Sequence, residues 1–421
     1  MDFQVRQLGL AEIPSPLGLS TALGDGIADY TPADAGVTVT LPAGAGEARF
    51  ELAGPRERLY FDGPRVSAGI VTCGGLCPGM NDVIRGVVRS LWRMYGVRRV
   101  VGFRFGYAGM VPDTLHPPIF LDPDRVDAIH HRGGSVLGSS RGAQDARQMM
   151  DLLERMDLDI VFAVGGDGTM RGAHLLAEEA ARRGRRLSVI GLPKTIDNDL
   201  PYVERSFGFQ TAVGVATQAL RAAHVEAEGA YRGVGIVKLM GRHAGFVAAT
   251  AALASGEVDL VLVPERSFGV RRVAQVLGEI LDRRGHALVV VAEGAGQDLV
   301  HAAGKDASGN ARLADIGIFL RDTLHERLPG ASIKYIDPSY MIRAAPADSA
   351  DAVYCGQLAE HAVHAAMSGR TDMVVGLSGG RFTHVPLQAL TATTKQLDLD
   401  GDLWRSVVDL TRQPYVLDDP T

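Results

Sequence analysis

The sequence predicts an α/β protein of two doubly wound lobes with parallel sheets, preceded by a β-rich amino-terminal arm. Two observations carry this prediction. Short apolar runs, such as residues 160–164 and 187–192, have the length and composition of strands buried in a parallel sheet. Segments with helical periodicity of about 10–15 residues separate the runs, and this alternation implies parallel strands joined by right-handed crossovers. The expected lobes are therefore Rossmann-like.

The same alternation divides the chain into parts. The amino-terminal arm mixes short strand-like runs with Pro/Gly-rich pieces and is expected to carry no functional site. After the second lobe, a helix and a strand are expected to return to the first sheet. The expected parts are an arm at 1–60, a first lobe at 61–205 plus about 345–385, a second lobe at 206–344, and a polar tail at 386–421.

Composition limits the possible partners. The chain has 421 residues, 46% of them hydrophobic, and a net charge of −6, so no long-range attraction to nucleic acid or an anionic membrane is expected. No stretch approaches the roughly 20 apolar residues that span a bilayer, and the charged amino end does not resemble a signal peptide. The three cysteines favour a reducing compartment over a disulfide framework. A cytoplasmic protein is expected.

The strand at 160–164 ends in Gly165-Gly166-Asp167-Gly168-Thr169, and a helix is expected to follow. Glycines at such a turn let the backbone approach a ligand, and the free N–H groups of the next helix favour an anion. The turn is therefore interpreted as a phosphate cradle. Asp167 could hold a hydrated Mg²⁺ that bridges phosphates. The structural alternative is that Asp167 only caps the helix.

The neighbouring strand ends in Pro193-Lys194-Thr195-Ile196-Asp197-Asn198-Asp199. If the two strands are parallel neighbours, both turns lie at the same carboxyl edge of the sheet, where doubly wound folds bind ligands. A carboxylate here can accept the proton of a hydroxyl that attacks a phosphoryl group, and Asp197 is the candidate base. An Asx-turn is the alternative for Asp197, but it does not explain the adjoining Lys194.

Basic residues recur in other strand-end turns and glycine loops, as Arg141, Arg242 and Arg343 do. The arginine fork suits phosphate oxygens, although any one of these side chains alone would be interpreted as a solvated charge. Glu293 ends a strand of valine, leucine and alanine and could accept hydrogen bonds from a sugar hydroxyl. The alternative for Glu293 is a capped turn.

Together these motifs resemble the 6-phosphofructokinase family over residues 66–380. The resemblance rests on GGLCPGMN at 74–81, GGDGT at 165–169, PKTIDND at 193–199, MGR at 240–242, AEG at 292–294 and YMIR at 340–343. It implies the phosphofructokinase fold and transfer of a phosphoryl group to the 1-hydroxyl of fructose 6-phosphate, giving fructose 1,6-bisphosphate in glycolysis.

The resemblance also implies roles for individual residues. The catalytic set is Asp197 as the base with Thr195, Lys194 and Arg242, and Asp167 serves the Mg²⁺. The phosphate donor is bound by Gly74, Gly75, Arg141, Gly142, Gly166, Asp167, Gly168, Thr169 and Gly172. The sugar phosphate is bound by Thr195, Ile196, Asp197, Met240, Gly241, Arg242, Glu293, Lys334, Tyr340, Met341, Ile342 and Arg343. For Lys334 the resemblance suggests action from a neighbouring subunit.

Two positions bear on the identity of the phosphoryl donor, and they favour different donors. Gly168 is typical of ATP users, since pyrophosphate users tend to carry Asp there, whereas Lys194 recurs in pyrophosphate users. ATP-dependent enzymes of plant and trypanosome type combine both residues, and the run KLMGR at 238–242 also resembles that subgroup. ATP is therefore the expected donor, and pyrophosphate is the alternative.

Two further alternatives stay open. A kinase of the NAD-kinase or lipid-kinase type shares the GGDG turn but is disfavoured by the downstream motifs. A non-catalytic regulatory subunit of the same fold would be expected to lack the base or the metal carboxylate, and both Asp197 and Asp167 are present. The resemblance implies a homodimer or homotetramer. It does not define the effectors, or whether sedoheptulose 7-phosphate is accepted.

Overall fold

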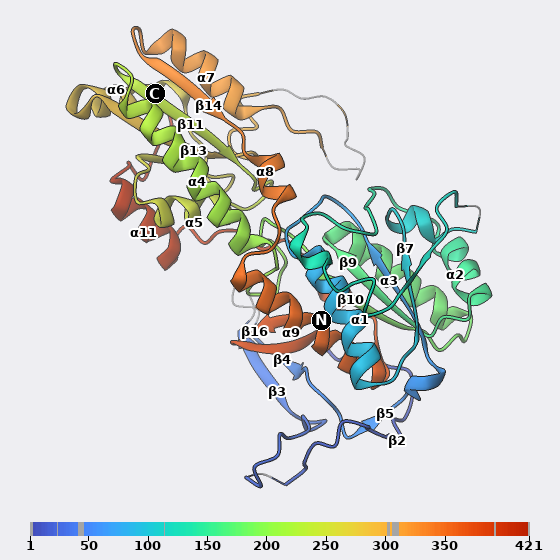
Figure 1. Ribbon diagram of the computed structural model, residues 1–421. Coiled ribbons are helices and arrows are strands. Elements are labelled where there is room, and N and C mark those ends of the chain that lie inside the picture. The colour runs from blue at the N-terminus through green and yellow to red at the C-terminus, as the bar shows by residue number, and fades with distance from the viewer. Residues whose placement is uncertain are drawn as a thin grey trace. The chain divides into compact units, whose positions relative to one another are not determined.

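The computed structural model describes residues 3–22, 24–40, 46–112, 114–300, 304, 311–390 and 393–419 (Figure 1). The chain forms two compact units, each with a sheet of mainly parallel strands covered by helices, so the predicted α/β class is confirmed. Unit 1 comprises residues 1–195, 200–208 and 344–394, and unit 2 comprises 196–199, 209–343 and 395–421. These units differ from the predicted lobes, since 196–199 and most of the predicted tail belong to unit 2, whereas 206–208 and 344 belong to unit 1.

Unit 1 is built on a nine-stranded sheet of order β3-β4-β17-β16-β10-β9-β6-β7-β8. The five strands from β16 to β7 are parallel, and the outer strands are antiparallel to their neighbours. The strands are β3 (Gly36–Thr40), β4 (Glu47–Leu52), β6 (Ser67–Thr72), β7 (Arg99–Phe103), β8 (Ile119–Leu121), β9 (Ile160–Gly165), β10 (Ser188–Pro193), β16 (Met373–Ser378) and β17 (Arg381–Pro386).

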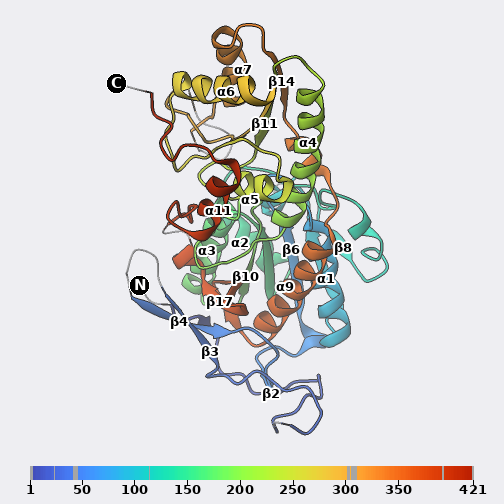
Figure 2. The same cartoon turned by 90° about the vertical axis from the view of Figure 1, so that its left-hand side faces the viewer.

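Helices cover both faces of this sheet (Figure 2). On one face, α1 (Met80–Met94) packs against α9 (Ser349–Met367), and Gly86 allows the close approach because a Cβ there would lie 2.6 Å from the Cβ of Ala359. On the other face, α2 (Ala146–Arg155), α3 (Asp167–Arg182) and α10 (Leu387–Leu390) bury one apolar cluster against the strands. Within the described part of this unit, the short 3-10 helices are η2 (Gly63–Arg65), η3 (Gly106–Met110) and η4 (Ile129–His131).

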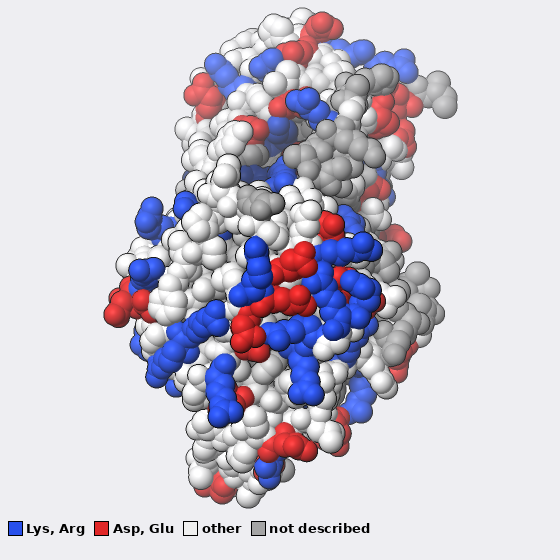
Figure 3. All heavy atoms as spheres, turned by 90° about the vertical axis from the view of Figure 1, so that its right-hand side faces the viewer, with Lys and Arg blue, Asp and Glu red and all other residues white. Residues whose placement is uncertain are grey.

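The outer surface around α2 and α3 mixes basic and acidic side chains (Figure 3). Arg183, at the end of α3, lies 2.7 Å from Asp151 and 3.0 Å from Glu154, both on α2. The same guanidinium lies 2.7 Å from Glu179 within α3. Such a shared network holds the two helices together more effectively than isolated surface pairs do.

The amino-terminal arm is part of unit 1. The β3–β4 hairpin extends the large sheet because β4 pairs with β17. Two short antiparallel pairs hold the rest of the described arm, namely β1 (Arg6–Gln7) with β15 (Arg370–Thr371) and β2 (Ile13–Pro14) with β5 (Arg58–Leu59).

Unit 2 contains a four-stranded, fully parallel sheet of order β12-β13-β11-β14. Helices α4 and α5 pack together on it, and α6 and α7 bury a separate apolar cluster against alternate strand residues such as Val234 and Ile236. The elements are α4 (Phe209–Glu228), β11 (Gly233–Leu239), α5 (Phe246–Ser255), β12 (Leu260–Leu262), α6 (Val270–Arg284), β13 (His286–Ala292), α7 (Ile316–Arg327), β14 (Ser332–Ile336), α8 (Ser339–Ala344) and α11 (Asp402–Thr411). Among the described residues, no helix is both long and apolar enough to cross a membrane.

Candidate active site

The turn between β9 and α3 is tightly packed, which explains its glycines. A Cβ at Gly165 would lie 2.1 Å from Oγ1 of the buried Thr169, and a Cβ at Gly166 would lie 3.2 Å from the carbonyl oxygen of Lys194. A Cβ at Gly168, in contrast, would meet no described atom within 4 Å. Packing thus requires glycine at position 165 and leaves little room for a side chain at 166, whereas Gly168 faces open space.

Asp167 is the first residue of α3, and its side chain is 51% exposed. One carboxylate oxygen lies 2.7 Å from the guanidinium of Arg171, one helical turn further on. A half-exposed carboxylate at a helix N-terminus beside open space suits Mg²⁺, because this ion keeps several waters and needs only one or two protein carboxylates together with substrate phosphates.

The glycine turn after β6 is joined to the loop that carries Arg141. Gly74 has a φ of +85°, which favours glycine, and its N–H donates to the carbonyl oxygen of Ser140 at 2.9 Å. The Ser139 hydroxyl donates back to the Gly74 carbonyl oxygen at 2.6 Å. Arg141 and Gly142 follow directly and are exposed. Sequence analysis did not identify the positioning role of these two serines, since an isolated Ser-Ser pair gives no such signal.

Lys194 connects the two glycine turns. Its side chain is buried, and its ammonium group donates to the Gly75 carbonyl oxygen at 2.9 Å. The backbone N–H of Lys194 donates to the carbonyl oxygen of Gly165, which extends the parallel pairing of β9 with β10. Thr195 follows, and its carbonyl oxygen accepts a hydrogen bond from Ser206. The prediction that both strand-end turns lie at one edge of the sheet is confirmed.

Gly172 has a packing role in α3. A Cβ there would lie 2.5 Å from the ring of Tyr107, and the Tyr107 hydroxyl donates to the carbonyl oxygen of Thr169 at 2.7 Å. The contact with Tyr107 is enough to explain why position 172 is a glycine, whether or not a ligand binds there. The place of Gly172 in the donor site therefore stays a prediction.

In unit 2, Asp197 lies against the turn that follows β11. The backbone N–H of Arg242 donates to the Asp197 carboxylate at 3.1 Å. Gly241 has a φ of +130°, and a Cβ there would lie 2.5 Å from the carbonyl oxygen of Ala244, so the turn requires glycine. Burial, followed by the charges of Asp199 and Glu293, raises the pKa of Asp197. A half-buried carboxylate with a raised pKa has the properties of a general base.

Glu293 comes from the next strand of the same sheet. Its N–H donates to the Leu239 carbonyl oxygen at 2.8 Å, and the Gly294 N–H donates to the Gly241 carbonyl oxygen at 3.0 Å. A Cβ at Gly294 would lie 1.9 Å from the Arg242 carbonyl oxygen, so the two turns are in direct contact. Burial raises the pKa of Glu293, while the positive charges around it oppose this shift.

The predicted YMIR run forms the short helix α8. Tyr340 is 88% exposed and Met341 is also exposed, whereas Ile342 is fully buried and anchors the helix. The positive charge of Arg343 opposes the rise that burial causes in the pKa of Asp197 and of Glu293. Met240, just before Arg242, is buried. The contacts of unit 2 join Asp197 to the turn of Gly241 and Arg242, and join that turn to Glu293 and Gly294. A place in the sugar-phosphate site stays a prediction for Ile196, Met240, Tyr340, Met341, Ile342 and Arg343.

Lys334 is placed differently. It lies within the edge strand β14, in register with Gly235 rather than with the carboxyl end of β11, and its ammonium group is 3.8 Å from Glu226 on α4. The half-exposed side chain is thus on the flank of unit 2. Its role in binding the sugar phosphate stays a prediction.

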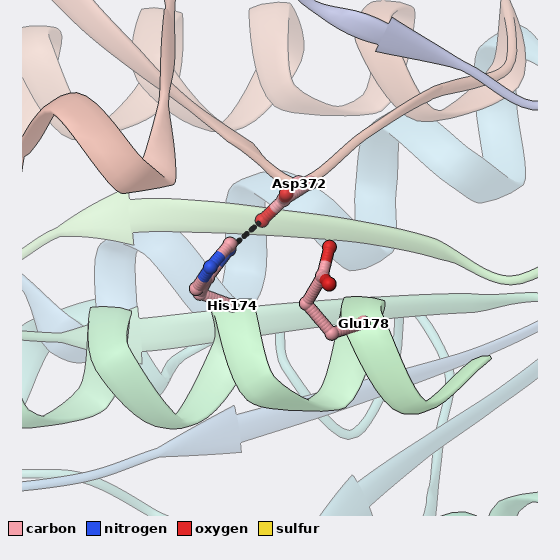
Figure 4. A group of neighbouring side chains, drawn as sticks. All are labelled: His174, Glu178 and Asp372. Atoms are coloured by element: carbon pink, nitrogen blue, oxygen red, sulfur yellow. Dashed lines mark hydrogen bonds and ion pairs between the residues drawn. The ribbon is translucent and has the colours of Figure 1, made fainter. Parts of the chain in front are cut away.

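One group of described residues has the spacing of metal ligands, and it is separate from Asp167. His174 and Glu178 lie one turn apart on α3, and Asp372 precedes β16 (Figure 4). His174 lies 2.8 Å from Asp372, but the guanidinium of Arg6 lies 2.7 Å from Glu178 and 3.7 Å from Asp372. The arm therefore already supplies a cation to these carboxylates.

Comparisons with known proteins identify relatives of this chain. The sequence profile of the family described as "Phosphofructokinase" matches residues 67–366. The chain is 50% identical to an ATP-dependent 6-phosphofructokinase of Amycolatopsis methanolica, over 87% of this chain and 83% of the relative. It is 48% identical to an ATP-dependent 6-phosphofructokinase of Trypanosoma brucei brucei, over 86% of this chain and 76% of the relative.

Solved structures support the fold. The pyrophosphate-dependent phosphofructokinase of Marinobacter aquaeolei superimposes with a TM-score of 0.70 at 23% identity, covering 82% of this chain and 91% of that chain. The phosphofructokinase of Saccharomyces cerevisiae gives a TM-score of 0.64 at 22% identity, covering 82% of this chain and 48% of that chain. With the family profile spanning most of the sequence and relatives near half identity, the chain belongs to the phosphofructokinase family.

Proposed function

We propose that this chain is an ATP-dependent 6-phosphofructokinase, which transfers the γ-phosphoryl group of ATP to the 1-hydroxyl of fructose 6-phosphate. The observation that carries the proposal is the half-buried Asp197, held by the Arg242 N–H and surrounded by Glu293 and Arg343. Near-half identity to ATP-dependent 6-phosphofructokinases supports both the acceptor and the donor.

Asp197 is proposed as the general base. As the 1-hydroxyl oxygen bonds to the γ-phosphorus, its proton passes to the Asp197 carboxylate, and the bond from the γ-phosphorus to the bridging oxygen breaks to release ADP. The shift brings the pKa of Asp197 closer to neutral pH, and a general base is most effective when its pKa lies near the working pH. Arg242 and Arg343 are proposed to hold the 6-phosphate, and Glu293 a sugar hydroxyl.

The donor is proposed to bind at the glycine turns of unit 1. The open space beside Gly168 leaves room for a nucleotide phosphate, and the exposed Arg141 can reach phosphate oxygens. Asp167 is the residue proposed to hold Mg²⁺, which neutralises phosphate charge when bound. Thr169 and Lys194 complete the proposed donor and catalytic sets.

Lys194 is compatible with ATP because its ammonium is bonded inside the protein. A buried ammonium donating to the Gly75 carbonyl oxygen fixes one glycine turn against the other strand end. That role accounts for Lys194 without pyrophosphate, which supports ATP as the proposed donor. A homodimer or homotetramer in the cytoplasm remains the proposed assembly and location.

The test is the initial rate with fructose 6-phosphate and Mg²⁺, with ATP and pyrophosphate supplied in parallel. Turnover with ATP and none above background with pyrophosphate is the expected result. Turnover with pyrophosphate alone would show that the assignment of ATP as donor is wrong, while the assignment of fructose 6-phosphate as acceptor would be kept. Binding of both substrates without turnover would instead identify a regulatory subunit.

A further inference from the structure

Lys238 connects three elements of unit 2 through one ammonium group. It lies on β11, two residues before Met240, and its side chain is 11% exposed. The ammonium lies 2.6 Å from the Asp315 carboxylate and 3.0 Å from the Asp337 carboxylate. Asp315 precedes α7 and Asp337 follows β14, so residues distant in sequence meet at this single cation.

Each carboxylate that faces Lys238 also accepts hydrogen bonds from the residues that begin a helix. Asp315 accepts hydrogen bonds from the backbone N–H groups of Gly317 and Ile318 at the start of α7. Asp337 accepts from the N–H of Ser339 at 3.0 Å and from its hydroxyl, at the start of α8. Since α8 carries Tyr340 to Arg343, the position of Asp337 sets the position of those side chains.

Two facing carboxylates would repel each other without a cation between them. Burial alone would raise the pKa of both carboxylates. The hydrogen bond to Lys238 is the main opposing cause for Asp315, and the hydrogen bonds from Ser339, followed by the one from Lys238, oppose burial for Asp337, so that the pKa of each is lowered. The Tyr335 hydroxyl donates to Asp315 at 3.1 Å and closes the cluster. A partly buried ammonium with two carboxylates is far more strongly coupled than an exposed pair.

We propose that Lys238 is a positioning residue for sugar-phosphate binding, which holds Asp337, and with it the start of α8, against the strand that leads to Met240 and Arg242. This inference rests on the proposed function of unit 2 and deepens it. Lys238 touches no substrate in this role. It sets the spacing between the two segments, β11 to Arg242 and α8, that supply the phosphate-binding arginines.

Lys238 also acts on Glu293 through its charge. Burial raises the pKa of Glu293, and the Lys238 ammonium is among the positive charges that oppose this shift. Removing the ammonium should raise the pKa of Glu293 further. The acid limb of the pH profile of 1/KM for fructose 6-phosphate should then move to higher pH, which a purely structural role would not cause.

The test compares Lys238→Met, Lys238→Arg and Asp337→Asn with wild type. We expect Lys238→Met to raise KM for fructose 6-phosphate about tenfold or more while KM for ATP stays within about twofold. The reason is that even a small displacement of α8 would misplace the side chains proposed to bind the sugar phosphate. Asp337→Asn should act in the same direction, the double variant should be less than additive, and Lys238→Arg should restore part of the loss. Arg321→Met, which breaks an exposed pair with Asp322 in the same unit, is the matched control.

Hydrogen exchange of the α8 amides provides a readout that does not depend on activity. Lys238→Met should accelerate exchange in α8 and leave the helices of unit 1 unchanged. If wild type shows no turnover of fructose 6-phosphate, the proposed function fails, and exchange alone still tests the positioning role. An unchanged KM for fructose 6-phosphate with unchanged α8 exchange would overturn the proposal, as would equal rises in KM for both substrates. If Lys238→Met does not fold, Asp337→Asn decides by the same criteria.

Discussion

The backbone N–H of Arg242 points at the carboxylate of Asp197 and donates to it at 3.1 Å. This contact orients the carboxylate without using the Arg242 side chain, because the donor is a main-chain group. The Arg242 guanidinium donates separately to the carbonyl oxygen of Ala311. Phosphoryl transfer depends mainly on positioning and charge neutralisation, and a carboxylate held beside an arginine-bearing turn suits both.

Asp197→Asn should abolish most turnover while leaving the fold intact. The amide keeps the size of the side chain and can still accept the Arg242 N–H, but it cannot take a proton from the hydroxyl. Removal of a positioned base typically lowers kcat by about 10²–10⁴-fold. The measurement is kcat at saturating substrates, with the melting temperature as a check on folding. A kcat within threefold of wild type would exclude Asp197 as the base.

Asp199→Asn should shift the pH dependence of kcat. After burial, the charge of Asp199 is the largest contribution to the raised pKa of Asp197. The base must be ionised, so activity is lost as pH falls through that pKa. Without the Asp199 charge the pKa of Asp197 should fall, and the acid limb of the kcat profile should move to lower pH. If the acid limb of the kcat profile does not move, the ionisation of a group other than Asp197 controls it.

The sequence was sufficient for the fold class and for the residues at strand ends, because those follow from local patterns. The apolar run at 160–164 and the glycines after it predict a strand and a turn whatever the rest of the chain does. The Lys238 cluster could not be predicted in this way, since Asp315 and Asp337 are distant in sequence and meet Lys238 only through the order of β11 and β14. Gly172 was assigned to a ligand, but its contact with Tyr107 depends on the packing of η3 against α3, which no local pattern reports.

Glu51→Gln should destabilise unit 1. The Glu51 carboxylate lies 2.7 Å from Arg56, contacts Arg370, and lies 3.2 Å from His384. Loss of the single acid leaves two buried guanidinium groups without their counter-charge, and breaking such a pair costs about 3–5 kcal/mol. The free energy of unfolding from urea titration tests this. Glu47→Gln, on the exposed side of the same strand, is the control and should change stability by less than about 0.5 kcal/mol.

His361 should make the protein less stable in mild acid. Burial lowers the pKa of His361 to about 4, with the charge of His364 acting in the same direction. The folded state therefore keeps this ring neutral while the unfolded state gains a proton below the ordinary value of about 6.5. Stability falls as pH drops from 7 toward 4, by about 2 kcal/mol between pH 7 and 5 from this group.

The measurement is urea unfolding of wild type and His361→Asn at pH 7, 6 and 5. The variant cannot titrate at this position, so the difference between the two proteins should shrink as pH falls. His325→Gln replaces an exposed histidine on α7 and should leave the pH dependence of wild type unchanged. A constant difference between wild type and His361→Asn across the range would contradict the prediction.

Gly168→Asp should weaken the use of ATP without damage to the fold. A Cβ at position 168 meets no described atom within 4 Å, so the new side chain has space, and Asp is favourable in the first turn of a helix. Its carboxylate would lie where nucleotide phosphates are proposed to bind and would repel them. We expect KM for ATP to rise at least tenfold while KM for fructose 6-phosphate stays within about twofold. Gly356→Asp, at an equally open and exposed position on α9, is the matched control and should leave both values unchanged. If Gly168→Asp keeps the wild-type KM for ATP, the donor phosphates do not bind beside this residue.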